Sequence, residues 1–172
     1  MVSGADPVEL DPVLRLIEAG QERERTNEAR KVTCSNERTG QIESARAFVR
    51  TNWAAIQIKF KDACAQDKGC KDINGEQFVL SFGESTVYCP TEEKNKATGV
   101  VIEMPGQDYT HGAYGLFPSA FASPCELVDS VTHEEAHLIT GSYHSFSSLG
   151  VDTMYRLGQA SGEVCKEQGF SF

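Results

Sequence analysis

Residues 123–141 read SPCELVDSVTHEEAHLITG, and this stretch decides the expected fold. It opens with a capping box, in which Ser123 is the N-cap, Pro124 takes the first helical position and Glu126 stands three residues after the cap. Gly141 stands where the helix should stop, and glycine is the common residue just past a helix end. The stretch therefore predicts a helix that starts at Pro124 and ends before Gly141.

The predicted helix carries an HExxH pattern formed by His133, Glu134 and His137. Residues four apart lie on one helical face, so the two imidazoles can share one Zn²⁺ at roughly 2.0–2.1 Å each. Glu134 can then reach a metal-bound water as general base and later proton donor, while zinc acidifies that water and polarises a peptide carbonyl. A chain of this composition holds the pattern by chance roughly 0.01 times. The alternative is a helix with two ordinary surface or core histidines.

A catalytic zinc site needs a third protein ligand and an open fourth position. The candidates downstream of the pattern are His144, Asp152 and Glu163. Two of them have a simpler interpretation, since Asp152 also suits the N-cap of the last predicted helix and His144 suits an exposed loop.

The segment from Cys34 to about Gly162 resembles the aspzincin metalloendopeptidases, the deuterolysin-like group that includes peptidyl-Lys enzymes. In that family HExxH is followed by GTxDxxYG, whose Asp is the third zinc ligand and whose Tyr helps to stabilise the oxyanion. The D-x-x-Y core stands here as Asp152 and Tyr155, so the resemblance implies these roles for them. The motif is degenerate, because GT is reduced to Gly150-Val151 and the Gly after the Tyr is Arg156.

A competing alignment places residues 141–144 on the GTxD part of the motif, which would make His144 the third ligand. We favour Asp152, because it brings Tyr155 with it one helical turn away. The family's carboxy-terminal segment that shapes the pocket for Lys has no counterpart, so we do not expect specificity for Lys.

The resemblance implies a zincin-like single domain of the α+β class, with a long N-terminal helix, a small antiparallel sheet with an edge strand, and HExxH on the active-site helix. Apolar residues at spacings of three and four predict the long helix over residues 39–65. Alternating and β-branched residues predict strands within 78–82, 86–88, 99–104 and 113–117, and a last helix is expected over about 152–168.

The glycine-interrupted segment before the HExxH helix matches the place of the substrate-binding edge strand of zincins. The resemblance implies that an extended peptide adds to this strand through main-chain hydrogen bonds, with Ala113, Tyr114, Gly115 and Leu116 as binding residues. The alternative is an ordinary glycine-rich connector.

The six cysteines are even in number and widely spaced, with no CxxC pair. They predict two or three disulfides in an oxidising compartment, with buried free thiols in a cytosolic protein as the alternative. Cys64 and Cys70 flank a short loop that a disulfide could close, and a disulfide at Cys165 could fix the last helix. The sequence does not choose among the fifteen connectivities.

The net charge of −9 argues against nucleic-acid binding and against docking on anionic lipid. No apolar run approaches the ~20 residues that span a bilayer, so we expect no membrane insertion. Residues 1–31 are expected to be a charged appendage or linker, and residues 32–172 the metallopeptidase domain. The N-terminus does not read as a signal peptide. A leader already removed, a longer parent protein and export without a cleaved leader all stay open.

These observations predict a zinc-dependent metalloendopeptidase that acts as a monomer on protein or peptide substrates in a secreted or extracytoplasmic setting. Such a domain suits a digestive enzyme, and it equally suits an effector toxin with a delivery module or a cognate inhibitor as partner. The rival function is a non-catalytic, disulfide-stapled binding module with a structural or degenerate metal site. Joint coordination by Asp152 and His144 would close the site and favour that rival.

Overall fold

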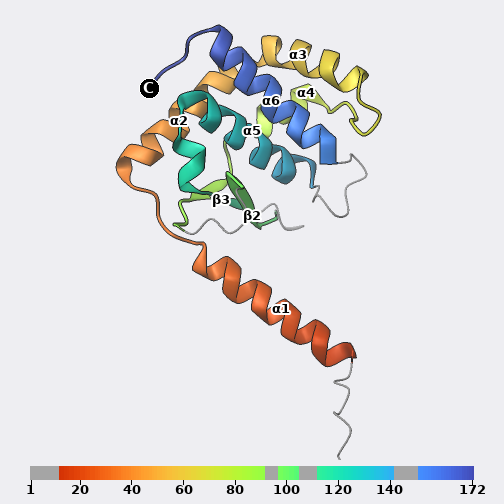
Figure 1. Ribbon diagram of the computed structural model, residues 1–172, viewed down its shortest axis with the longest axis vertical. Helices are drawn as coiled ribbons and strands as arrows, with labels where there is room; N and C mark the ends of the chain where they lie inside the picture. The colour runs from red at the N-terminus through yellow and green to blue at the C-terminus, as the bar shows by residue number, and fades with distance from the viewer. Residues whose placement is uncertain (1–11, 92–96, 105–111, 142–150) are drawn as a thin grey trace, which may run out of the picture.

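The structure, a computed structural model, describes residues 12–91, 97–104, 112–141 and 151–172 (Figure 1). Helices and a small sheet combine into an α+β domain, which confirms the expected class. The elements in chain order are α1 (Pro12–Ala29), α2 (Asn36–Thr51), α3 (Trp53–Ala65), α4 (Gly75–Ser81), β1 (Thr86–Tyr88), β2 (Gly99–Glu103), β3 (Ala113–Leu116), the 3₁₀ helix η1 (Pro118–Phe121), α5 (Pro124–Thr140) and α6 (Val151–Glu167).

Helix α5 is the central element of the domain. It packs against α6 and α2 and against strands β2 and β3, while α3 covers the outer side of α6 (Figure 1). Every residue from 130 to 138 is buried, including the whole HExxH pattern. The helix that carries the HExxH pattern is therefore also the core of the fold.

The ends of α5 confirm the prediction from its capping signals. The Ser123 hydroxyl oxygen accepts a hydrogen bond from the Glu126 backbone N–H at 3.1 Å, and Pro124 is the first helical residue. At the other end Gly141 adopts φ +66°, the left-handed conformation that glycine accommodates without a Cβ clash. The last helix, α6, is also confirmed to within one residue of the predicted bounds.

The sheet is mixed and has the order β1-β3-β2. Strand β3 pairs in parallel with β1 and antiparallel with β2, with an irregularity between Val101 and Glu103. The expectation of an antiparallel sheet with residues 113–116 at its edge is therefore wrong: β3 is the central strand of the described sheet. Its residues are buried, as expected of a strand covered by α5.

The apolar stripe over residues 39–65 forms two helices instead of one long helix. The break falls at Asn52, which serves as the C-cap of α2 and the N-cap of α3 with φ −104° and ψ 14°. Its backbone N–H and its side-chain Nδ2 both donate to the carbonyl of Phe48, each at 2.9 Å. The short amide side chain competes with the regular helical pattern here, which favours a helix end. Periodicity continues across the break because both helices face the same core.

The strand expected at 78–82 is a helix, α4. Its N-cap is Asn74, whose side-chain oxygen accepts from the Gln77 backbone N–H at 3.1 Å. Phe78 and Phe82 are buried with ring centroids 5.3 Å apart. A spacing of four places two rings on one face of a helix as well as on one face of a strand, so the cap decides between the two. The strand at 86–88 is confirmed as β1.

Three disulfides join the six cysteines, which confirms the expectation of two or three: Cys34–Cys89, Cys64–Cys70 and Cys125–Cys165. The first ties the lead into α2 to the residue after β1, and the third ties the start of α5 to the end of α6. Disulfides persist in oxidising compartments, so this set indicates an extracytoplasmic environment.

Helix α1 projects from the body of the molecule and buries none of its residues (Figure 1). Its last turn touches the sheet, where Asn27 Nδ2 donates to the carbonyl of Ile102 at 3.1 Å. Lys31 follows and pairs with the carboxylates of Glu28 and Glu103. Nowhere in the described ranges does a helix combine the length and the apolar character needed to cross a membrane.

Candidate metal centre

The two histidines of α5 bring their Nε2 atoms together. The His133 and His137 Nε2 atoms lie 3.1 Å apart, and the two rings are 9% and 2% exposed. Two nitrogens that bind one tetrahedral zinc at 2.0–2.1 Å each would stand about 3.3 Å apart. The ring planes differ by 77°, so the rings meet edge to face and do not stack. The 3.1 Å separation is that of a hydrogen bond between the two rings, and it is also close to the separation that a shared zinc requires.

Glu134 follows His133 on α5, and its side chain packs against strand β2. A Cβ placed on Gly99 of β2 would come within 2.7 Å of the Glu134 Cγ and Oε1 atoms, so the glycine leaves room for this side chain. Burial raises the pKa of Glu134 to about 8, because a carboxylate loses hydration there. A nearby cation favours the ionised form and opposes that shift. A metal at the histidines would therefore help to prepare Glu134 as a base.

Tyr155 of α6 lies beside the histidine pair. Its ring centroid is 4.7 Å from that of His133, with 52° between the planes, and the residue is 52% exposed. Position 155 thus borders both the candidate metal site and solvent. This placement is compatible with the expected contact with a bound substrate.

Helices α5 and α6 run antiparallel in a regular register. Cys125 is bonded to Cys165, and the Ser161 hydroxyl donates to the carbonyl of Val128 at 3.4 Å. One turn further along α5, Tyr155 meets His133. Position 152 lies about one turn before Tyr155, at the start of α6.

The third ligand is not found among the described side chains. No group of three His, Cys, Asp or Glu that could hold a metal occurs in the part of the chain that the structure describes. Asp152 belongs to the first turn of α6, but its side chain lies outside the described residues, and so does the whole of His144. Glu163 lies elsewhere on α6, where its carboxylate pairs with Lys59 at 3.6 Å.

The residues expected to bind substrate lie inside the domain. Ala113, Tyr114, Gly115 and Leu116 form β3, whose main chain already pairs with a strand on each side. Tyr114 is fully buried, and its hydroxyl donates to Glu135 at 3.0 Å. A peptide cannot add to β3 as a further strand. Strand β2 is the sheet edge that adjoins Glu134.

A buried polar cluster of Arg46, Glu135 and Tyr114, on the other side of α5, was not predicted from the sequence. Glu135, the residue after Glu134, accepts hydrogen bonds from Arg46 of α2 and from Tyr114 of β3. A signal for it exists in the sequence, since Arg46 falls on the buried stripe of α2 between Ile42 and Val49. A charged residue in such a stripe requires a buried partner.

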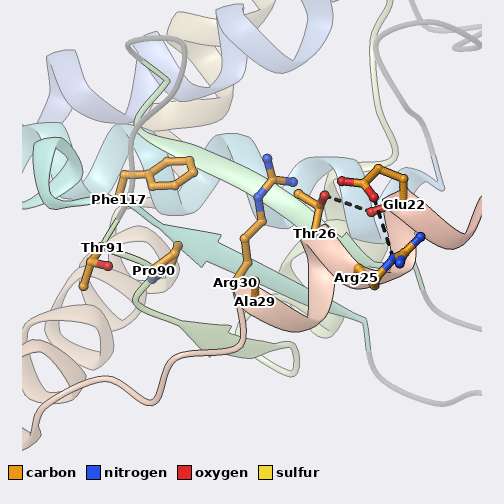
Figure 2. A pocket seen from close by; sticks show the side chains of 8 residues that line it. All are labelled: Glu22, Arg25, Thr26, Ala29, Arg30, Pro90, Thr91 and Phe117. Atoms are coloured by element: carbon orange, nitrogen blue, oxygen red, sulfur yellow. Dashed lines mark hydrogen bonds and ion pairs between the residues drawn. The ribbon is translucent and has the colours of Figure 1, made fainter. Parts of the chain in front are cut away.

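A pocket of about 350 Å³ lies away from the histidines, between α1 and the segments that flank the sheet (Figure 2). Within it Thr26 donates to the Glu22 carbonyl at 2.9 Å, and Arg25 pairs with the Glu22 carboxylate at 3.7 Å. None of its lining residues belongs to α5 or α6, so it is separate from the candidate metal centre. These residues are Glu22, Arg25, Thr26, Ala29, Arg30, Pro90, Thr91 and Phe117.

Comparisons of the chain with protein-family models, with curated proteins and with solved structures give no match in any of the three.

Proposed function

We propose that this protein is a zinc-dependent metalloendopeptidase with a zincin-like active-site helix. The observation that carries the proposal is the 3.1 Å approach of the His133 and His137 Nε2 atoms on a buried helix that also carries the buried Glu134. Two imidazoles one helical turn apart, with a glutamate next to the first, supply two ligands and the base of a hydrolytic zinc site, and a third ligand completes it.

Asp152 is the proposed third ligand, and Tyr155 is its companion in the D-x-x-Y core. The contact of Tyr155 with His133 supports this choice, because Asp152 lies about one helical turn from Tyr155 on α6. A set of two imidazoles and one carboxylate suits zinc and leaves a fourth position open for chemistry.

Zinc, when bound, supplies a Lewis acid that acidifies water and polarises a peptide carbonyl. Glu134 accepts a proton at its carboxylate from the attacking water as the new carbon–oxygen bond forms. Glu134 then delivers that proton to the amide nitrogen as the carbon–nitrogen bond breaks, which returns the carboxylate to its starting state. The hydroxyl of Tyr155 donates a hydrogen bond to the carbonyl oxygen as negative charge develops there.

Strand β2 is the proposed docking edge for the substrate backbone. It lies at the edge of the sheet, and its first residue, Gly99, is packed against Glu134. A peptide added along this edge would pass close to the carboxyl that handles the proton. We therefore assign the main-chain binding of the substrate, predicted for residues 113–116, to the neighbouring strand β2.

The proposed setting is outside the cytoplasm, which the three disulfides support. A secreted enzyme and a delivered effector toxin share this chemistry and differ in their partners. Cleavage of a broad peptide mixture suits the first role, whereas a single cleaved protein target suits the second.

The test compares wild type with Glu134→Gln for zinc content and for cleavage of casein and a peptide library. Glu126→Gln is the matched control, because Glu126 is an exposed carboxylate on the same helix. We expect one zinc per chain in all three proteins and hydrolysis in wild type and Glu126→Gln only. Full activity in Glu134→Gln would overturn the mechanism. Zinc binding without hydrolysis by wild type would leave a non-catalytic binding module.

A further inference from the structure

The side chain of Glu135 is fully buried and receives four hydrogen bonds. Its Oε1 accepts from Arg46 Nη2 at 2.6 Å, from Arg46 Nε at 3.1 Å and from the Tyr114 hydroxyl at 3.0 Å. Its Oε2 accepts from the Gly83 backbone N–H at 3.1 Å. Hydrogen bonds between a guanidinium and a carboxylate are among the strongest and most directional in proteins, so this carboxylate is held in one place.

Arg46 extends the same cluster to other parts of the fold. Its Nη1 pairs with the Glu43 carboxylate at 2.8 Å, and its Nη2 donates to the Ser85 carbonyl at 2.7 Å. The Arg46 side chain is only 6% exposed. The cluster of Arg46, Glu135 and Tyr114 thus joins α5 to α2, to β3 and to the turn before β1.

The position of Glu135 on α5 relates this cluster to the candidate metal centre. Successive residues of an α-helix are rotated by about 100° around the helix axis. Glu135 is two residues from His133 and two residues from His137, so its side chain points about 200° away from each of them. The cluster therefore holds the face of α5 opposite the two imidazoles. Rotation of α5 about its axis would break these hydrogen bonds and would move both imidazoles relative to α6, whose Tyr155 lies against His133.

A purely stabilising role does not account for this cluster. A buried ion pair must overcome the desolvation of both charges, and apolar residues of similar volume often stabilise a core equally well or better. What the ion pair adds is direction, because a guanidinium and a carboxylate fit each other in few orientations.

We propose that the Arg46–Glu135–Tyr114 cluster is a positioning device that fixes the rotation of α5 and thereby sets His133, Glu134 and His137 relative to α6, which carries Tyr155 and the proposed third ligand. The inference rests on the proposed function and extends it to residues that do not touch metal or substrate. Its consequence is that the cluster controls zinc affinity and turnover while contributing little to the stability of the metal-free fold.

The test uses the double variant Arg46→Met/Glu135→Met, which replaces the ion pair by apolar side chains of similar length. Arg50→Met is the matched control, because Arg50 lies one turn further along α2 and donates to the Phe82 carbonyl at 3.3 Å without contacting Glu135. The measurements are the zinc dissociation constant in competition with a chromophoric chelator, the Tm of the metal-free protein, and kcat and KM for a peptide substrate.

We expect the double variant to keep the Tm of the metal-free protein within a few degrees and to bind zinc about 10- to 100-fold more weakly, the range found when supporting partners of metal ligands are removed. Its kcat should fall while KM stays near the wild-type value, and Arg50→Met should match wild type. A folded double variant with wild-type zinc affinity and kcat would overturn the inference.

A second variant and the zinc binding of the wild-type protein complete the test. If the double variant does not fold, Tyr114→Phe removes one hydrogen bond and leaves the ion pair in place. A several-fold loss of zinc affinity in this variant supports the inference, and an unchanged affinity contradicts it. Failure of wild type to bind zinc would remove the proposed function and this inference together, whereas zinc binding that is insensitive to the cluster would remove only the inference.

Discussion

The ring of Tyr155 lies 4.7 Å from the ring of His133, measured between centroids, and joins the start of α6 to the histidine-bearing side of α5. The contact places a half-exposed phenol beside the first imidazole of the HExxH pattern. It also brings the two sequence patterns into contact, because the tyrosine of the D-x-x-Y core packs against the first histidine of HExxH.

Tyr155→Phe should lower kcat and leave zinc binding intact. Loss of one hydrogen-bond donor to a developing oxyanion typically costs about 10²–10³ in kcat. The ring itself is kept, so the contact with His133 and the Tm should persist. Tyr88→Phe, in β1, is the control and should behave as wild type. A wild-type kcat in Tyr155→Phe would exclude the phenol from the reaction.

Gly99→Ala should impair catalysis through Glu134. The added methyl group would lie 2.7 Å from the Glu134 Cγ and Oε1 atoms, so the carboxyl must move. We expect at least about a 10-fold loss of kcat, because displacement of a proton-transferring group by about 1 Å is costly. Gly40→Ala in α2 is the control, since nothing lies within 4 Å of its added Cβ. Equal activity in the two variants would contradict the placement of Glu134.

Asp129 predicts a specific pH dependence of stability. Burial, aided by the charge of Glu126 and opposed by Lys166, raises the pKa of this α5 carboxyl from 3.8 to about 6. Folding therefore favours the protonated form, a contribution that is complete below about pH 3.8 and is lost as the pH rises through about 6.

Asp129→Asn keeps a neutral side chain at every pH and should remove this dependence. Above about pH 6 we expect the variant to be more stable than wild type by about 1–2 kcal/mol, a range below the full value of the shift because Asp129 is partly exposed. Urea unfolding of both proteins at pH 4 and pH 8 measures the difference. An equal difference at the two pH values would show that Asp129 does not titrate as expected.

The disulfide between α5 and α6 should contribute more stability than the local one in the 64–70 loop. Removal of Cys125–Cys165, with a sequence separation of 40, should cost about 4 kcal/mol, because the unfolded chain regains the entropy of a long loop. Removal of Cys64–Cys70, with a separation of 6, should cost about 2 kcal/mol. Denaturant unfolding of the two double Cys→Ala variants compares them. The reverse order would contradict the loop-length argument.

The sequence predicted best what local chemistry determines. The bounds of α5 follow from Ser123, Pro124 and Gly141, whose effects act within one helical turn. The strand predicted at 78–82 is wrong for a local reason as well. Phe78 and Phe82 satisfy both helical and strand spacing, and the N-cap at Asn74 favours the helix.

Long-range pairing lay beyond the sequence. Alternating residue types predict that a segment is a strand, but they do not predict which strands pair. The position of β3 between β1 and β2 therefore could not be predicted. The pairing of Arg46 with Glu135 joins residues 89 apart, and only the folded chain brings them together. The HExxH spacing fixed which side chains share a face of α5, but the register with α6 that carries Tyr155 to His133 emerged from helix packing.

The most direct test of the metal centre is X-ray absorption at the zinc edge on the protein loaded with one equivalent of zinc. The account predicts a four-coordinate site with two imidazole nitrogens at roughly 2.0–2.1 Å, the remaining positions being filled by oxygen. His137→Ala should lose one imidazole from that spectrum and most of its zinc affinity. A protein that takes up no zinc, or a spectrum without imidazole scattering, would contradict the account.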